Sequence, residues 1–186
     1  MSRLSVMPTP IDGLLLIEPA HLADQRGFFE RIFCIRQLET VMEGRSIAQM
    51  NRSFTANRGV VRGLHFQHSP HAEMKLVACL RGVIFDVAVD LRNGSPTFLH
   101  WHAELLTPDN FRTLVIPEGF AHGFQTLTDE CELLYLHTAP YEPTAEAGLH
   151  PSDPRLAIDW PLDISKLSDR DRNHPTIDES FSGLVL

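Results

Sequence analysis

The sequence has 186 residues, of which 43% are hydrophobic and 22% are charged, and its formal net charge is −8. A chain of this length and composition predicts one globular domain, residues 1–186, and no run is apolar enough for a membrane span. The acidic balance argues against general nucleic-acid binding, which needs a basic face. It leaves room for an anionic ligand held by a few local cations.

Residues 1–13 contain no long apolar stretch, so we expect no secretory leader. The three cysteines are far apart and predict neither a disulfide framework nor a zinc knuckle. Reduced thiols are typical of a cytoplasmic protein, which is the location we expect. Thirteen prolines favour short elements joined by turns, while ten histidines suggest metal ligands or acid–base groups.

Most of the predicted elements are short strands. In chain order, strands are predicted at 14–18, 60–66, 74–80, 83–91, 97–106, 112–116, 120–127 and 131–137, and short helices at 36–43 and 164–171. Turn residues such as Asn93-Gly94-Ser95-Pro96 separate the strands. This spacing predicts a mainly β fold, a jelly-roll barrel with short helices and a C-terminal extension that packs back onto the barrel.

The strand predicted at 83–91 alternates apolar and acidic side chains. Its apolar face carries Phe85, Val87, Val89 and Leu91, and its other face carries Asp86 and Asp90. We expect the apolar face to belong to the core and interpret the two aspartates as structural.

Two segments concentrate residues that can do chemistry. The first is Arg62-Gly63-Leu64-His65-Phe66-Gln67-His68, which continues to His71, Glu73 and Lys75. On a regular strand Arg62 and His65 would face opposite sides, and only a bulge would bring them together. In the second segment, Pro117-Glu118-Gly119-Phe120-Ala121-His122-Gly123-Phe124, glycines permit a tight turn that delivers His122 at the start of a strand.

Together these segments resemble the two motifs of the cupin jelly roll. In metal-binding cupins the ligands are a His-x-His pair, a glutamate and a later histidine. Here the pair is His65-Phe66-Gln67, so a glutamine replaces the second histidine. Three histidines and a carboxylate would be the strong signal for a borderline metal, and this chain offers only two histidines at the expected positions. We therefore expect no metal site and keep a metal-dependent cupin as an alternative.

Longer runs strongly resemble the dTDP-4-dehydrorhamnose 3,5-epimerase family. They are RGVVRGLHFQHSPHAEMKLVACLRGVIFDVAVDLRNGSPTF, IPEGFAHGFQTLTDECELLYLHTAPYEP and DPRLAIDWP, and the resemblance extends from Asp24 to Asp171. It implies a metal-free, cofactor-free, cupin-like isomerase whose substrate is a nucleoside-diphosphate 4-keto-6-deoxyhexose. It also implies a homodimer in which the amino-terminal strand completes the partner's sheet, with no nucleic-acid or membrane partner.

The resemblance implies a reaction and roles for particular residues. The C3 and C5 protons are acidic because each carbon adjoins the C4 ketone, so a base removes one and an acid returns it on the opposite face. His65 matches the base, Asp171 the aspartate that holds its tautomer, and Tyr135 the acid. Lys75 matches the cation near the developing O4 oxyanion. Substrate-binding positions are matched by Arg26, Gln49, Asn51, Arg62, His122 and Glu146.

The sequence departs from the family pattern at several positions. They are Arg31 with Glu30 before it, Leu136 in place of a lysine, Pro140-Tyr141 in place of a tyrosine pair, and Met74 preceded by Glu73. Arg31 and Glu73 are compatible with either a site or a surface ion pair. Three alternatives stay open: a C3-only epimerase or one for another nucleotide sugar, a metal-dependent cupin enzyme, and a non-catalytic cupin that binds sugar nucleotides.

Overall fold

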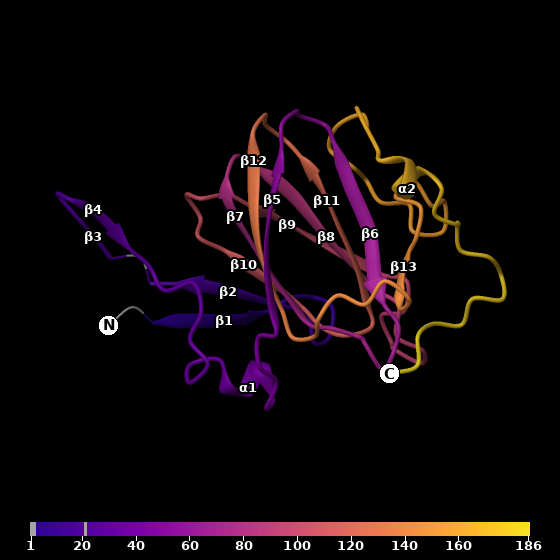
Figure 1. The fold of residues 1–186 in the computed structure, drawn as a ribbon, viewed down its shortest axis with the longest axis horizontal. Coiled ribbons are helices and arrows are strands. Elements are labelled where there is room, and N and C mark those ends of the chain that lie inside the picture. Colours follow the sequence, from indigo (N-terminus) through magenta and orange to yellow (C-terminus); the bar gives the residue numbers. More distant parts are fainter. Residues whose placement is uncertain (1–2, 21) are drawn as a thin grey trace.

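The computed structural model describes residues 3–20 and 22–186. Two antiparallel sheets face each other across the body of the protein (Figure 1). The six-stranded sheet contains, in spatial order, β1 (Leu4–Pro8), β2 (Leu15–Pro19), β10 (Thr113–Ile116), β7 (Lys75–Arg81), β12 (Cys131–His137) and β5 (Gln49–Thr55). The five-stranded sheet contains β13 (Glu146–Gly148), β6 (Val61–Gln67), β11 (Phe120–Thr126), β8 (Ile84–Asp90) and β9 (Trp101–Leu106).

The other elements lie around this sandwich. A two-stranded hairpin, β3 (Leu22–Asp24) and β4 (Gly27–Phe29), projects away from the body (Figure 1). The helices α1 (Glu39–Met42) and α2 (Asp169–Arg172) are one turn each. Among the described residues, none of the helices has the length and apolarity needed to cross a membrane.

The predicted mainly β jelly roll is confirmed, although its two sheets stay separate instead of closing into one barrel. All eight predicted strands overlap observed ones, but the prediction missed β1, β3, β4, β5 and β13. These five strands are short or, like β5, lack a clean alternation of apolar and polar residues. Residues 97–100 are not strand, because the Ser95 and Thr97 hydroxyls donate to Asp90 at 2.5 and 2.7 Å and hold a loop.

The second helix begins later than predicted. Ser168 is its N-cap, with extended backbone angles, and accepts a hydrogen bond from the Asp171 backbone N–H at 3.0 Å, which fixes the start of the helix after this residue. The residues just before it form no helix, and Lys166 forms a backbone bridge with Val60 next to β6. The cap therefore places Asp171 in the first turn, beside the five-stranded sheet.

Apolar side chains cover both faces of the five-stranded sheet. One cluster lies between the sheets and includes Ile84 and Ala88 of β8. A second cluster joins Val87 and Val89 of the same strand to Leu156 and other residues of the C-terminal segment. The predicted apolar face of this strand thus packs under the extension, while its aspartate face looks into the space between the sheets.

A bulge between β6 and β11 decides which side chains reach that space. His122 pairs with His65, but Phe124 pairs with Arg62, so three steps along β6 match two along β11. Arg62 and His65 consequently reach the same side of the sheet. The bulge needs Gly63, which has φ +123° and lies so close to Gly123 that a Cβ would come within 2.5 Å of the Gly123 Cα.

We expect Gly63→Ala to destabilise the protein through this contact. Gly27→Ala is the matched control, because Gly27 has φ +128° but nothing within 4 Å of the position that a Cβ would occupy. Both variants incur the cost of a positive φ, so the difference between them isolates the steric cost of overpacking, about 1–3 kcal/mol. Denaturant unfolding at one protein concentration measures it, and equal losses in the two variants would contradict the prediction.

Candidate active site

A cavity of about 800 Å³ opens between the inner faces of the two sheets. Its walls come from β5, β6, β7, β11, β12 and β13 and from the segment that precedes and begins α2. Eight of the ten site residues predicted from the sequence line it: Asn51, Arg62, His65, Lys75, His122, Tyr135, Glu146 and Asp171. This volume is within the usual range for small-molecule sites.

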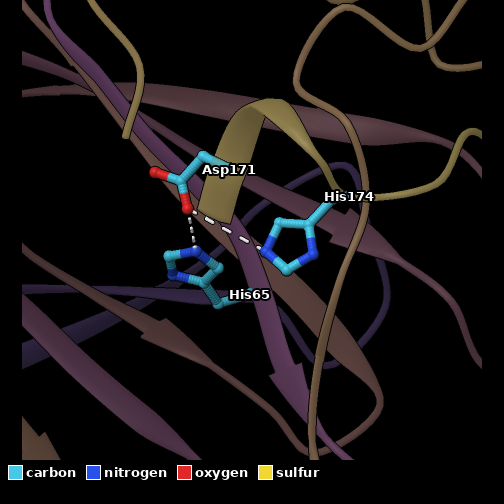
Figure 2. A group of neighbouring side chains, drawn as sticks. All are labelled: His65, Asp171 and His174. Carbon is cyan, nitrogen blue, oxygen red and sulfur yellow. Dashed lines mark hydrogen bonds and ion pairs between the residues drawn. The ribbon is translucent and has the colours of Figure 1, made fainter. Parts of the chain in front are cut away.

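His65 and Asp171 form a close pair at one wall of the cavity. The imidazole Nε2 lies 2.7 Å from Asp171 Oδ1, and Figure 2 shows α2 bringing the carboxylate over the strand that carries the histidine. Burial alone would raise the pKa of Asp171, but the contacts with His65, Ser168 and the Gly63 backbone together outweigh it and hold the pKa below the usual 3.8. An ionised carboxylate accepts the Nε2 proton and leaves His65 Nδ1 as the basic nitrogen.

Tyr135 approaches the cavity from the opposite sheet. Its hydroxyl lies 3.2 Å from Ser53 Oγ on the neighbouring strand β5. Burial raises the pKa of Tyr135 well above its usual value of 10. The phenol therefore keeps its proton at neutral pH and is available as a proton donor.

A second histidine–carboxylate pair lies beside the first. His122 pairs with His65 across the strands, and its Nε2 lies 2.7 Å from Oδ1 of Asp86. Asp86 is fully buried, and burial raises its pKa even though His122 opposes this shift. The sequence analysis interpreted Asp86 as structural; it lies behind the cavity wall and contacts the cavity through His122.

Lys75 is held at the start of β7. Its Nζ lies 3.2 Å from Glu73 Oε1 and donates to the backbone carbonyl of His65 at 3.4 Å. Burial alone would raise the pKa of Glu73, but His137 and Lys75 lower it overall. The sequence was compatible with Glu73 in a site or in a surface ion pair. The structure places it in the cavity wall.

Arg170 is a further residue of this wall that the sequence prediction omitted. Its Nη2 lies 3.2 Å from His65 Nε2, and its Nη1 lies 2.9 Å from Glu146 Oε1. The available signal was its position directly before Asp171. The guanidinium forms an ion pair with Glu146 of β13 and places positive charge in the cavity beside His65.

Two predicted substrate-binding residues do not line the cavity. Gln49 lies at its edge, where its side chain donates to Asn51 Oδ1 at 3.2 Å and accepts from the Tyr141 backbone N–H at 3.0 Å. Arg26 lies on the projecting hairpin, its side chain 85% exposed and paired with Asp24 at 2.6 Å. Within this single chain, Arg26 is not brought to the site.

The part of the chain that the structure describes contains one group with metal-ligand geometry, formed by His65, Asp171 and His174 (Figure 2). Their ligand atoms lie within 4.8 Å of one another. However, Arg170 already places a cation beside His65 Nε2. Gln67, the residue at the cupin ligand position, instead donates to the carbonyl groups of His71 and Pro140 and supports loops.

Comparison with known proteins identifies the family. A model of the family described as dTDP-4-dehydrorhamnose 3,5-epimerase matches residues 8–179. The chain belongs to this family. The resemblance predicted from the sequence motifs is thereby confirmed.

Individual members of the family show the same extent of similarity. The dTDP-4-dehydrorhamnose 3,5-epimerase of Shigella flexneri is 44% identical over 172 residues, covering 91% of this chain and 94% of that protein. A dTDP-4-dehydrorhamnose 3-epimerase of Streptomyces niveus is 42% identical over 171 residues, covering 91% and 82%. The structure of dTDP-6-deoxy-D-glucose-3,5-epimerase from Legionella pneumophila in complex with dTDP-4-keto-L-rhamnose has a TM-score of 0.90 and 40% identity, covering 99% of this chain and 100% of that chain.

We expect Asp171→Asn to lower the free energy of unfolding at neutral pH. Because the pKa of Asp171 is depressed in the folded protein, its ionised form contributes stability above the usual carboxyl pKa of 3.8. That contribution is lost as pH falls through the folded-state pKa, so the difference between the two proteins should narrow in acid. Denaturant unfolding at pH 7 and at acidic pH values measures this, and a difference that grows in acid would contradict it.

Proposed function

We propose that the protein epimerises a nucleoside-diphosphate 4-keto-6-deoxyhexose at C3, at C5 or at both, without a cofactor. The observation that carries this proposal is the opposition of His65 and Tyr135 across one cavity. His65 belongs to β6 in one sheet and Tyr135 to β12 in the other. A base and an acid on opposite walls suit a reaction that takes a proton from one face of a carbon and returns it to the other.

The electrostatics of the cavity support the same chemistry. Loss of a proton next to the C4 ketone places negative charge on O4, and a cation already in position stabilises it. Lys75, fixed by two contacts, supplies that cation. Arg62 lines the same cavity and is suited to the diphosphate, since a guanidinium binds phosphate oxygens in pairs.

The family relatives support the substrate class and leave the number of epimerised carbons open. The Shigella flexneri protein is described as a 3,5-epimerase and the Streptomyces niveus protein as a 3-epimerase, at nearly equal identity to this chain. The Legionella pneumophila structure holds dTDP-4-keto-L-rhamnose. We therefore propose a dTDP-linked 4-keto sugar as the substrate.

We expect His65→Asn to lower the rate of proton exchange at C3 and C5 by at least about a hundredfold, as general base catalysis is lost. The assay incubates dTDP-4-keto-6-deoxyglucose with the protein in deuterated water and follows deuterium at each carbon by NMR. His68→Asn is the matched control, because His68 is exposed just beyond the same strand. Full exchange by His65→Asn would exclude this histidine as the base.

The same assay tests the alternatives. A metal-dependent cupin enzyme, which the group of His65, Asp171 and His174 keeps open, would contain metal in stoichiometric amount and lose activity to a chelator. A non-catalytic binding protein would bind the nucleotide sugar without exchanging either proton. Exchange of the C3 or C5 proton that continues in the presence of a chelator supports the proposed function against both alternatives.

We also propose that the active unit is a homodimer in which the hairpin of one protomer reaches the cavity of the other. Phe28 and Phe29 of β4 are each more than half exposed, as is Met50 of β5. Strand β5 is the last strand of its sheet and lines the cavity, so a partner that covers this edge would also approach the site. Such an arrangement would bring Arg26 to the partner's cavity.

We expect Arg26→Gln to raise KM by about ten- to a hundredfold, the effect of losing a charged contact, without dissociating the dimer. Phe29→Ser should instead weaken dimerisation. Arg36→Gln, which removes an exposed arginine elsewhere, is the control. Analytical ultracentrifugation and steady-state kinetics measure the two effects, and a monomeric active protein would contradict the proposal.

A further inference from the structure

Glu73 contacts two side chains of the cavity wall, Lys75 and His137. Its side chain is only 8% exposed, and each carboxylate oxygen has its own partner: Oε1 lies 3.2 Å from Lys75 Nζ, and Oε2 lies 2.9 Å from His137 Nδ1. His137 pairs with Lys75 in the register of β12 and β7, so the two partners are neighbours on adjacent strands. One carboxylate thus fixes a cation and an imidazole at the same wall of the cavity.

The connection continues from His137 to the substrate-binding amides. His137 Nε2 lies 3.3 Å from Asn51 Nδ2, and Asn51 Oδ1 accepts from Gln49 Nε2 at 3.2 Å. The carboxylate can only accept, so His137 Nδ1 carries the proton and Nε2 accepts from Asn51. Every donor in this chain of hydrogen bonds therefore points toward Glu73.

We propose that Glu73 is a positioning residue of the site, which sets the Lys75 ammonium against the sugar oxygen and, through His137, orients the amide of Asn51 toward the substrate. This inference rests on the proposed function, because it assigns the alignment of both groups to one buried carboxylate. Glu73 itself takes no part in the proton transfers.

The charge state of Glu73 supports this role. Its pKa is lowered in spite of burial because Lys75 and His137 surround it, so it is ionised at neutral pH. An ionised carboxylate in a low-dielectric wall makes short, strongly directional hydrogen bonds. His137 also stacks on the Tyr135 ring, with centroids 6.1 Å apart and an interplanar angle of 21°, so its orientation affects the proposed acid.

Glu73→Gln tests the direction of the hydrogen bonds as well as the charge. If the amide oxygen accepts from Lys75, its NH₂ group faces the His137 Nδ1 proton, donor against donor. The imidazole can escape only by moving its proton to Nε2, which then faces the NH₂ group of Asn51. The substitution is nearly isosteric, yet it disturbs both Lys75 and Asn51.

We expect Glu73→Gln to lower kcat about tenfold or more and to raise KM. This is the size of effect expected when a hydrogen bond to a charged group is lost. His137→Phe keeps the ring on Tyr135 and leaves Glu73 with Lys75, so it should raise KM with a much smaller change in kcat. Glu132→Gln is the control, since this carboxylate pairs with Arg52 outside the cavity. Wild-type kcat in Glu73→Gln would overturn the proposal.

A second readout does not depend on activity. The chain has two lysines, Lys75 and Lys166, so ¹⁵N-labelled lysine gives two ammonium signals in NMR. Protons of an ammonium held by a buried carboxylate exchange slowly with water, and we expect this of Lys75 but not of exposed Lys166. Glu73→Gln should speed Lys75 exchange at least about tenfold, while His137→Phe should leave it slow.

The two readouts separate the possible failures. Equally fast ammonium exchange by both lysines in the unchanged protein would refute the positioning of Lys75 by Glu73. Absence of C3 and C5 proton exchange by the unchanged protein would refute the proposed function, while the ammonium signal would still report whether Glu73 holds Lys75. If Glu73→Gln lowered kcat but left the Lys75 ammonium protons exchanging as slowly as in the unchanged protein, the positioning role would be refuted. The loss of activity would then not come from a change at Lys75.

Discussion

The contact between Gly63 and Gly123 determines which side chains reach the cavity. Both residues lie where β6 and β11 approach so closely that neither position leaves room for a Cβ. The bulge at this contact pairs His65 with His122 and turns Arg62 to the same side as His65. A regular pair of strands would send Arg62 and His65 to opposite faces, and the proposed base and the proposed cation for the diphosphate would not share a site.

Around this contact, every histidine in the cavity wall has a carboxylate of its own. Asp171 lies 2.7 Å from His65, Asp86 lies 2.7 Å from His122, and Glu73 lies 2.9 Å from His137. A buried carboxylate selects the tautomer of its imidazole and limits the rotation of the ring. Three of the abundant histidines and three of the acidic residues that make the net charge negative are therefore paired with one another in the cavity wall.

The sequence predicted the fold class because apolar alternation and turn residues are local signals. Eight of the ten site residues that it predicted line the cavity, because their motifs resemble those of the family. It did not predict the contact of Asp86 with His122, since the alternation of β8 shows two faces but not that both are buried, one between the sheets and one under the C-terminal segment. The contact of Glu73 with His137 joins positions 64 residues apart, and no local pattern reports such a pairing.

The C-terminal segment forms part of the cavity wall as well as covering the sheet. Leu156, Ile177 and Leu184 bury the outer face of the five-stranded sheet, which anchors the segment on both sides of α2. The Ser168 cap then sets the turn that presents Asp171 to His65. Hydrophobic burial on one face of the sheet is therefore what keeps the carboxylate in place at the cavity on the other face. Loosening the segment would separate Asp171 from His65, the proposed base, before it disturbed the strands that carry the rest of the proposed site.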